Sequence, residues 1–295
     1  EKVAGVEHDF EKEGIRLVVK DGILTADGTT LGSDNGVAVA LMLMVLDDED
    51  IVHPPVECVF TTEEEVGLNG ARALDKSQIS ARTMINMDSE EEGVATISCA
   101  GGLRIECTRP VTRQQAEGTL LSIEISGLKG GHSGTDIDKE RQNAIRVMAR
   151  VLYQIMKNTD GKLVSFSGGN KDNAIPRECM ASLIFADAEE AKKAEELACS
   201  LAETLADEIT PYEENFTCEI TSEEGRTENA LSEEDAKAFI TAMYLAPNGV
   251  QSRNMKLDGF VVVSTNMGVA RAEENRLVIV FSPRSSVASL QEEMK

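Results

Sequence analysis

The sequence contains no tryptophan, and only 4% of its 295 residues are aromatic. This scarcity argues against the aromatic platforms on which sugars or single-stranded nucleic acids stack. Basic residues are also few, because 29 lysines and arginines stand against 52 aspartates and glutamates, giving a formal net charge of −23. Such a chain repels phosphate backbones and anionic lipid surfaces. We therefore expect neither nucleic acid nor a membrane as a partner.

Long apolar runs are also missing. The longest candidate, residues 36–46, is shorter than the roughly 18 residues of a membrane-spanning helix. The first residues, EKVAGVEHDFEKEG, are charged and lack the apolar core of a signal peptide. The six cysteines are scattered with no C-x-x-C pair, so we expect reduced thiols that mostly fill the core. A cytoplasmic location is the default expectation.

What the sequence does contain is enough apolar material, 41% of its residues, to build packed cores. The first hundred residues alternate between strand and helix patterns. We predict strands near Ile23, at 56–61 and at 83–87, and helices from Val37 and near Leu68. This alternation is typical of α/β folds, in which ligands bind at the carboxyl ends of the strands.

The pattern changes near residue 108, where we predict that a second domain begins. We therefore divide the chain into domains at 1–107 and 108–295. In the second, local patterns predict strands at 120–126, 259–263 and 276–281, helices at 143–157, 188–205 (after an Asp187 cap) and from Ser232, and an exposed loop at 222–229. The predicted class is α/β for the first domain and α+β for the second.

The segment GTTLGSDNG, residues 28–36, places Asp34 in a glycine-flanked turn just before an apolar helix. Read alone, this aspartate is a helix cap, since its side chain can accept hydrogen bonds from free amides. Crowding of three glycines and an asparagine around one carboxylate instead indicates an unusual backbone, which is typical of functional positions. The segment becomes informative together with two others.

The segment TTEEEVGLNGA, residues 61–71, follows an apolar predicted strand with three glutamates. Adjacent glutamates in so acidic a chain are also compatible with a solvated surface. At the end of a buried strand, however, one carboxylate can bind a cation while Glu64 or Glu65 takes a proton from water. The sequence alone leaves both interpretations open.

The segment MINMDSEEEG, residues 84–93, similarly ends an apolar run in Asp88. A surface turn is again the alternative. If all three segments reach one edge of a sheet, their carboxylates would repel each other unless a divalent cation neutralised them. Oxygen ligands alone suit magnesium, calcium or manganese, whereas zinc usually takes imidazole as well.

GTTLGSDNG, EEEVGLNG, NMDSEEEG, GLKGGHSG and NAIPRE occur in this order in the sequence, which in this respect resembles the aminoacyl-histidine (carnosinase-like) dipeptidases over nearly its whole length. That family is related to aminoacylase and the glutamate-releasing carboxypeptidases. The resemblance implies a two-zinc metallopeptidase with an α/β catalytic domain interrupted by an α+β lid. On this basis, residues 1–107 form part of the catalytic domain and residues 108–295 belong to the lid.

The resemblance also implies roles for the acidic residues. Asp34 would bridge two zinc ions, with a cis peptide bond to Asn35 that is frequent in the family. Glu65 and Asp88 would each bind one zinc, and Glu64 would be the general base. Cobalt or manganese are alternatives to zinc.

Residues of the lid are given roles in the same way. His132 in GGHSG would stabilise the oxyanion, Arg284 in SPRSS would bind the substrate carboxylate, and Asn266 in STNMG would add a hydrogen bond. Asn173 and Arg177 in NAIPRE would support them. Read alone, GGHSG is also compatible with a glycine turn that exposes His132, and Arg284 with a surface arginine.

The family carries an H-x-D-M-V motif before the residues matching EKVAGVEHDF, and a zinc-binding histidine beyond those matching SVASLQEEMK. This sequence contains neither. We therefore expect a fragment truncated at both ends that binds zinc weakly and is inactive by itself.

The leading prediction is metal-dependent hydrolysis of dipeptides, either of the Xaa-His type or of broad specificity. The first alternative is an amidohydrolase acting on N-acyl amino acids, which differs in not needing a free substrate amino group. The second is a noncatalytic binding protein that retains the fold. The resemblance leaves open whether His132 serves its own chain or the partner in a homodimer.

Overall fold

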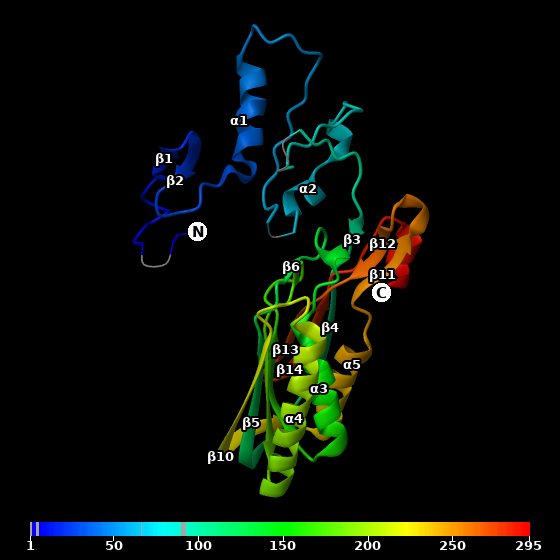
Figure 1. Ribbon diagram of the computed structural model, residues 1–295. Coiled ribbons are helices and arrows are strands. Elements are labelled where there is room, and N and C mark those ends of the chain that lie inside the picture. The colour runs from blue at the N-terminus through cyan, green and yellow to red at the C-terminus, as the bar shows by residue number, and fades with distance from the viewer. Residues whose placement is uncertain (1, 4–5, 66, 90–92) are drawn as a thin grey trace. The chain divides into compact units, whose positions relative to one another are not determined.

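The computed structural model describes residues 2–3, 6–65, 67–89 and 93–295 and separates into two compact units, 1–97 and 98–295 (Figure 1). We call them unit 1 and unit 2. The division falls before the boundary predicted at 108, because strand β4 (Ile105–Pro110) pairs along its length with β14 (Arg276–Phe281). Val66 and residues 90–92, parts of two acidic motifs, lie outside the described residues.

Unit 1 contains short elements. A hairpin of β1 (Leu17–Lys20) and β2 (Ile23–Ala26) precedes helix α1 (Ser33–Asp47), and α2 (Asn69–Ala73) and the 3₁₀ helix η1 (Lys76–Gln78) follow. The strand predicted near Ile23 and the helices predicted from Val37 and near Leu68 are therefore confirmed.

The strands predicted at 56–61 and 83–87 are wrong. No described residue pairs with either segment in a sheet, and the side chains of Met84 and Ile85 are 87% and 83% exposed. A strand exists only through hydrogen bonds to a neighbour lying about 4.8 Å away. An apolar run indicates a preference for burial but does not specify that neighbour.

Unit 2 is built on a seven-stranded antiparallel sheet in the order β10-β5-β9-β7-β13-β14-β4. Its remaining strands are β5 (Arg113–Ser126), β7 (Lys162–Gly168), β9 (Cys179–Phe185), β10 (Thr217–Leu231) and β13 (Met267–Ala272). The strands predicted at 120–126 and 276–281 are thus confirmed.

Two smaller sheets complete unit 2. One has the order β11-β12-β15-β3, and the other pairs β6 with β8. Their bounds are β3 (Gly101–Gly102), β11 (Gly249–Asn254), β12 (Phe260–Thr265), β15 (Arg284–Ser285), β6 (Gly131–His132) and β8 (Ala174–Ile175). The two-residue strands β6 and β15 place His132 and Arg284, respectively, on paired backbone.

Three helices cover one face of the large sheet: α3 (Ala144–Asn158), α4 (Ala188–Ile209) and α5 (Glu233–Leu245) (Figure 1). Each begins after a residue whose side chain accepts a hydrogen bond from a first-turn amide, namely Asn143, Asp187 and Ser232. The three predicted helices are confirmed. Short helices η2 (Ile137–Lys139), η3 (Met255–Leu257) and α6 (Ala288–Glu293) occur elsewhere in unit 2. Among the described residues, no helix is long and apolar enough to cross a membrane.

The core of unit 2 lies between these helices and the sheet. Ile145, Met148, Leu152 and Ile155 recur at helical spacing on α3, and their side chains are completely buried. Each such burial contributes about 1.5–3 kcal/mol relative to exposure. Unit 2 is therefore a well-packed scaffold for the loops at its edges.

The loop predicted at 222–229 is also wrong, because these residues belong to β10. The strand pairs with β5 on both sides of an irregularity between Glu223 and Arg226. Gly225 lies inside this irregularity with a φ of +69°, a conformation that glycine adopts without steric cost. Charged, glycine-containing sequence resembles a loop, but here it forms a β-bulge in an edge strand.

The cysteines are free thiols, but they do not mostly fill the core as predicted. Only Cys179 is buried, Cys58 and Cys218 are half-buried, and Cys99, Cys107 and Cys199 are exposed. Burial raises the pKa of Cys218 to about 11. The burial of a cysteine depends on which face of a strand or helix it occupies, and scattered positions in the sequence do not indicate that face.

Candidate functional site

The glutamate segment of unit 1 folds into a tight loop. The Gly70 amide donates to the Thr62 carbonyl over 3.1 Å, and the Asn69 side chain donates to Glu63 Oε2 over 3.0 Å. A Cβ on Gly70 would lie 2.5 Å from the Thr62 carbonyl oxygen, so only glycine allows this closure. The closed loop presents residues 64–65 at the surface.

Asn35 links the aspartate turn to the third acidic segment. Its Oδ1 accepts a hydrogen bond from the Ala38 amide, and its Nδ2 donates to the Met87 carbonyl, each over 3.1 Å. The side-chain cap of α1 is therefore provided by Asn35. Asp34 precedes it with non-helical backbone angles and a cis peptide bond. The hydrogen bond between Asn35 and Met87 thus joins the residues next to Asp34 and Asp88 in the sequence.

Four carboxylates from the three acidic segments interact electrostatically. Partial loss of hydration, followed by the negative charges of Glu65, Asp88 and Asp34, raises the pKa of Glu64 above its ordinary value. Within the described part of unit 1, the ion pairs join Asp9 or Glu13 to nearby basic side chains, and none involves these four residues. Among the residues that the structure describes, no lysine or arginine therefore forms an ion pair that would compensate their mutual repulsion.

A divalent cation fits this cluster by charge and donor type. Oxygen donors with excess negative charge suit such ions. The four carboxylates do not form a complete set of metal ligands, however. In residues 2–3, 6–65, 67–89 and 93–295, no three His, Cys, Asp or Glu side chains are arranged to hold a metal. The assignment of such an ion to Asp34, Glu65 and Asp88 therefore stays a prediction.

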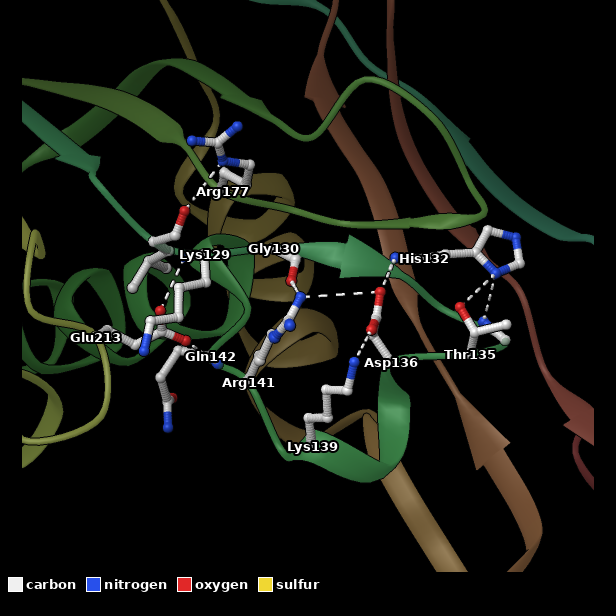
Figure 2. Close-up of polar contacts among 12 residues, drawn as sticks. Lys129, Gly130, His132, Thr135, Asp136, Lys139, Arg141, Gln142, Arg177 and Glu213 are labelled. Atoms are coloured by element: carbon white, nitrogen blue, oxygen red, sulfur yellow. Dashed lines mark hydrogen bonds and ion pairs between the residues drawn. The ribbon is translucent and has the colours of Figure 1, made fainter. Parts of the chain in front are cut away.

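His132 occupies an ordered position in unit 2. Its strand β6 pairs with Ala174 in β8, and its backbone amide donates to Asp136 Oδ2 over 2.9 Å (Figure 2). The Gly134 amide donates to the imidazole Nδ1 over 3.3 Å. Since a backbone N–H can only donate, Nδ1 is an acceptor, and the neutral ring carries its proton on Nε2. The exposed imidazole therefore has Nε2–H as its hydrogen-bond donor.

Gly134 also brings His132 next to Arg284. A Cβ on Gly134 would lie 2.9 Å from His132 Cε1 and 3.2 Å from Arg284 Cζ. Arg284 Nε is buried with no hydrogen-bond partner in the described part of the chain. None of the ion pairs found among the described residues of unit 2 includes Arg284. Within the described part of the chain, its guanidinium is thus a cation without a carboxylate partner, close to an imidazole.

Asn266, for which the sequence predicts a substrate contact, lies in the interior of unit 2. The residue is 1% exposed, and its Nδ2 donates to the carbonyls of Asp172 and Ala174 over 3.0 and 2.8 Å. Both amide protons are used, so none is left for a substrate. Asn266 instead holds the segment that carries Asn173, whose side chain is exposed and whose carbonyl accepts from the Ser133 amide over 2.8 Å.

Arg177 contacts the glycine-rich segment that precedes His132. Its Nε donates to the Leu128 carbonyl over 3.0 Å. Its side chain fills the space where a Cβ of Gly130 would lie, 2.3 Å from Arg177 Cγ. The structure therefore brings His132 and Arg284 together at Gly134 and places the Asn173 backbone beside Ser133, while Asn266 and Arg177 hold neighbouring segments of unit 2.

Sequence reasoning missed the residues that hold these groups. Gly134 and Asp136 contact His132, yet neither was singled out from GGHSGTD. A glycine two residues after a histidine and an aspartate four residues after it are local features, and both could have been noticed.

Comparisons with known proteins show what the whole chain resembles. Residues 123–230 match the M20 family model described as "Peptidase dimerisation domain". Cytosol non-specific dipeptidase of Escherichia coli (strain K12) is 34% identical over 284 residues, covering 96% of this chain and 58% of that protein. The crystal structure of aminoacylhistidine dipeptidase from Vibrio alginolyticus matches with a TM-score of 0.76 and 35% identity, covering 100% of this chain and 60% of that one.

The chain is a homologue of these dipeptidases.

The chain spans somewhat under two thirds of the length of these relatives, 58% and 60%. The resemblance inferred from the motifs is confirmed, and so is the mixed α/β class. The family match lies wholly within unit 2, which contains His132.

Proposed function

We propose that this chain supplies catalytic groups to a metal-dependent dipeptidase. The observation that carries the proposal is the cluster of Asp34, Glu64, Glu65 and Asp88, in which partial loss of hydration, followed by the three neighbouring carboxylates, raises the pKa of Glu64. Uncompensated carboxylates of this kind favour a bound cation, and a raised carboxyl pKa is typical of a catalytic acid–base group. The names of the two dipeptidase relatives support the same reaction class.

Asp34, Glu65 and Asp88 would hold two zinc ions, for which cobalt or manganese could substitute. When bound, such ions supply a more acidic water and polarise the scissile carbonyl. Glu64 would take the proton of the attacking water and pass it to the leaving amine.

His132, Arg284 and Asn173 would act on the substrate. The Nε2–H of His132 would donate to the oxygen on which negative charge develops, an interaction that strengthens in the transition state. Arg284, free of carboxylate partners among the described residues, would pair with the terminal carboxylate of a dipeptide. The exposed Asn173 would add a hydrogen bond to the same end.

The proposal extends to assembly and location. The family description "Peptidase dimerisation domain" supports a homodimer formed through unit 2. The name of the Escherichia coli relative supports a cytosolic location. Sedimentation equilibrium of the purified protein should give twice the monomer mass, and a monomer at micromolar concentration would contradict the dimer.

Metal content and hydrolysis should be measured together on the intact gene product that contains this chain. We expect two bound zinc ions and turnover of dipeptides, tested with Xaa-His and other sequences beside N-acyl amino acids. Glu64→Gln should abolish turnover while retaining metal, whereas Glu49→Gln, the same change at an exposed surface position, should change neither. A metal-free, inert wild-type protein would refute the proposal, and preference for N-acyl amino acids would replace the substrate class.

A further inference from the structure

Glu213 is a buried carboxylate without an assigned role. It lies in the turn after α4 and is 1% exposed, which is rare for glutamate unless the charge is paired or hydrogen-bonded. The adjacent Glu214 is exposed. Hydrogen bonds to the Glu213 carboxylate must therefore offset the cost of burying it.

Each carboxylate oxygen of Glu213 accepts a different backbone amide. Oε2 accepts from Lys129 over 2.8 Å, and Oε1 accepts from Gln142 over 3.2 Å (Figure 2). The Lys129 ammonium donates to the Tyr212 carbonyl over 2.6 Å, which joins the same two segments again. Lys129 and Gln142 are the two ends of the segment 129–142, and this segment carries His132. The Glu213 carboxylate thus holds the two ends of the loop together.

The interior of the loop is braced by polar contacts. Asp136 accepts from the His132 amide and pairs with Lys139, while Arg141 donates to the Gly130 carbonyl (Figure 2). A loop tied together internally moves as one piece, and its position is then set by the β6–β8 pairing and by the junction where its two ends join the rest of unit 2. Glu213 makes that junction at both ends.

We propose that Glu213 is a positioning residue for His132. Its two acceptor oxygens hold the ends of the loop so that the imidazole keeps its place, a role that rests on the proposed dipeptidase function. A glutamine has one acceptor oxygen and one NH₂ group, so in Glu213→Gln the NH₂ would face a backbone N–H and release one end of the loop. Small displacements of a catalytic group are costly, since an error of about 1 Å can reduce rates by roughly 100-fold.

Kinetics of the intact, zinc-loaded protein test this role. Glu213→Gln should lower kcat about tenfold or more with KM changed less than about twofold, because His132 acts on the transition state. Glu214→Gln is the matched control and should behave as wild type. In the His132→Ala background, Glu213→Gln should have little further effect on kcat, because the group that it positions is absent. Additive losses in the double variant would overturn the proposal.

Amide hydrogen exchange provides a second readout that needs no activity. Glu213→Gln should speed exchange within residues 129–142 while leaving the core helix α3 as protected as in wild type. Faster exchange throughout unit 2 would show a general loss of stability and would overturn the positioning role. If wild type hydrolyses no dipeptide, the proposed function has failed, and exchange alone then decides whether Glu213 holds the loop.

Discussion

The absence of a side chain at Gly134 sets how His132 and Arg284 lie side by side. A Cβ there would be 2.9 Å from the imidazole and 3.2 Å from the guanidinium carbon. Because the backbone of Gly134 has no positive φ, alanine would fit the chain conformation and strain only these two neighbours. Substitution of Gly134 by alanine should therefore disturb His132 and Arg284 without disturbing the folding of the chain.

Gly134→Ala should lower kcat/KM by roughly tenfold or more, since His132 or Arg284 must move by several tenths of an ångström. Thermal unfolding should change little. Gly14→Ala is the control, because its Cβ would meet nothing within 4 Å. Steady-state kinetics with a dipeptide substrate would measure the effect, and an unchanged kcat/KM would contradict the arrangement.

Asn266→Asp should destabilise unit 2 by about 1–3 kcal/mol, the usual cost of leaving buried polar groups unsatisfied. The carboxylate oxygens would face the carbonyls of Asp172 and Ala174, which need donors. Urea unfolding would measure the loss. A variant with wild-type stability and a raised KM would instead restore the substrate-contact role predicted from the sequence.

The candidate residues were accessible from the sequence to different degrees. Asp34, Glu64 and His132 lie in short motifs whose residue types indicate their chemistry. The role of Asn266 depends on carbonyls 92 and 94 residues away, which no local pattern encodes. Nothing in PYEEN distinguishes Glu213 from Glu214, because only the fold buries one and exposes the other.

Among the elements, the start of α5 shows a reciprocal cap. Ser232 Oγ accepts from the Asp235 amide over 3.1 Å and donates to Asp235 Oδ2 over 2.7 Å. The hydrogen bond from Ser232, with a further contribution from Arg109, lowers the pKa of Asp235 below its ordinary value. The ionised form of this aspartate is therefore the one that the folded state prefers.

Ser232→Ala should lower the free energy of unfolding by about 1 kcal/mol, as for other N-cap residues. The contribution of Asp235 has a definite pH dependence. Because its folded pKa is depressed, the stabilisation is fully present above the unfolded value of about 3.9 and is lost as pH falls through the folded pKa. Asp235→Asn should therefore reduce the stability difference between pH 7 and pH 3 in urea unfolding. An unchanged difference would show that the cap does not depend on charge.

Helices were predicted better than strands for a physical reason. The caps Asn143, Asp187 and Ser232 and the periodic apolar stripes lie within one segment of sequence, so local pattern suffices. The segments 56–61 and 83–87 required a neighbouring strand that does not pair with them here. In β10, the bulge around Gly225 was mistaken for a loop, because charge and glycine indicate exposure in both cases.

At the scale of the whole molecule, the two units differ in packing. Buried apolar residues lie almost entirely in unit 2, whereas in unit 1 the core includes little besides Ala38 among the described residues. Hydrogen exchange should show this difference directly. Amides of α3 should exchange only through large-scale unfolding, and those of residues 56–61 and 83–87 should exchange far faster. Comparable protection in the two units would contradict the described packing.

The exposed apolar side chains of unit 1, such as Met84 and Ile85, also bear on the fate of this chain in a cell. Chaperones and proteases recognise apolar, loosely hydrogen-bonded segments, and they act on such regions without waiting for a packed core to open. Turnover of this polypeptide would then begin in unit 1, and unit 2 would outlast it as a resistant remnant. The lifetime of the acidic cluster in unit 1 would be set by how well these apolar side chains are covered, independently of the stability of the scaffold that holds His132.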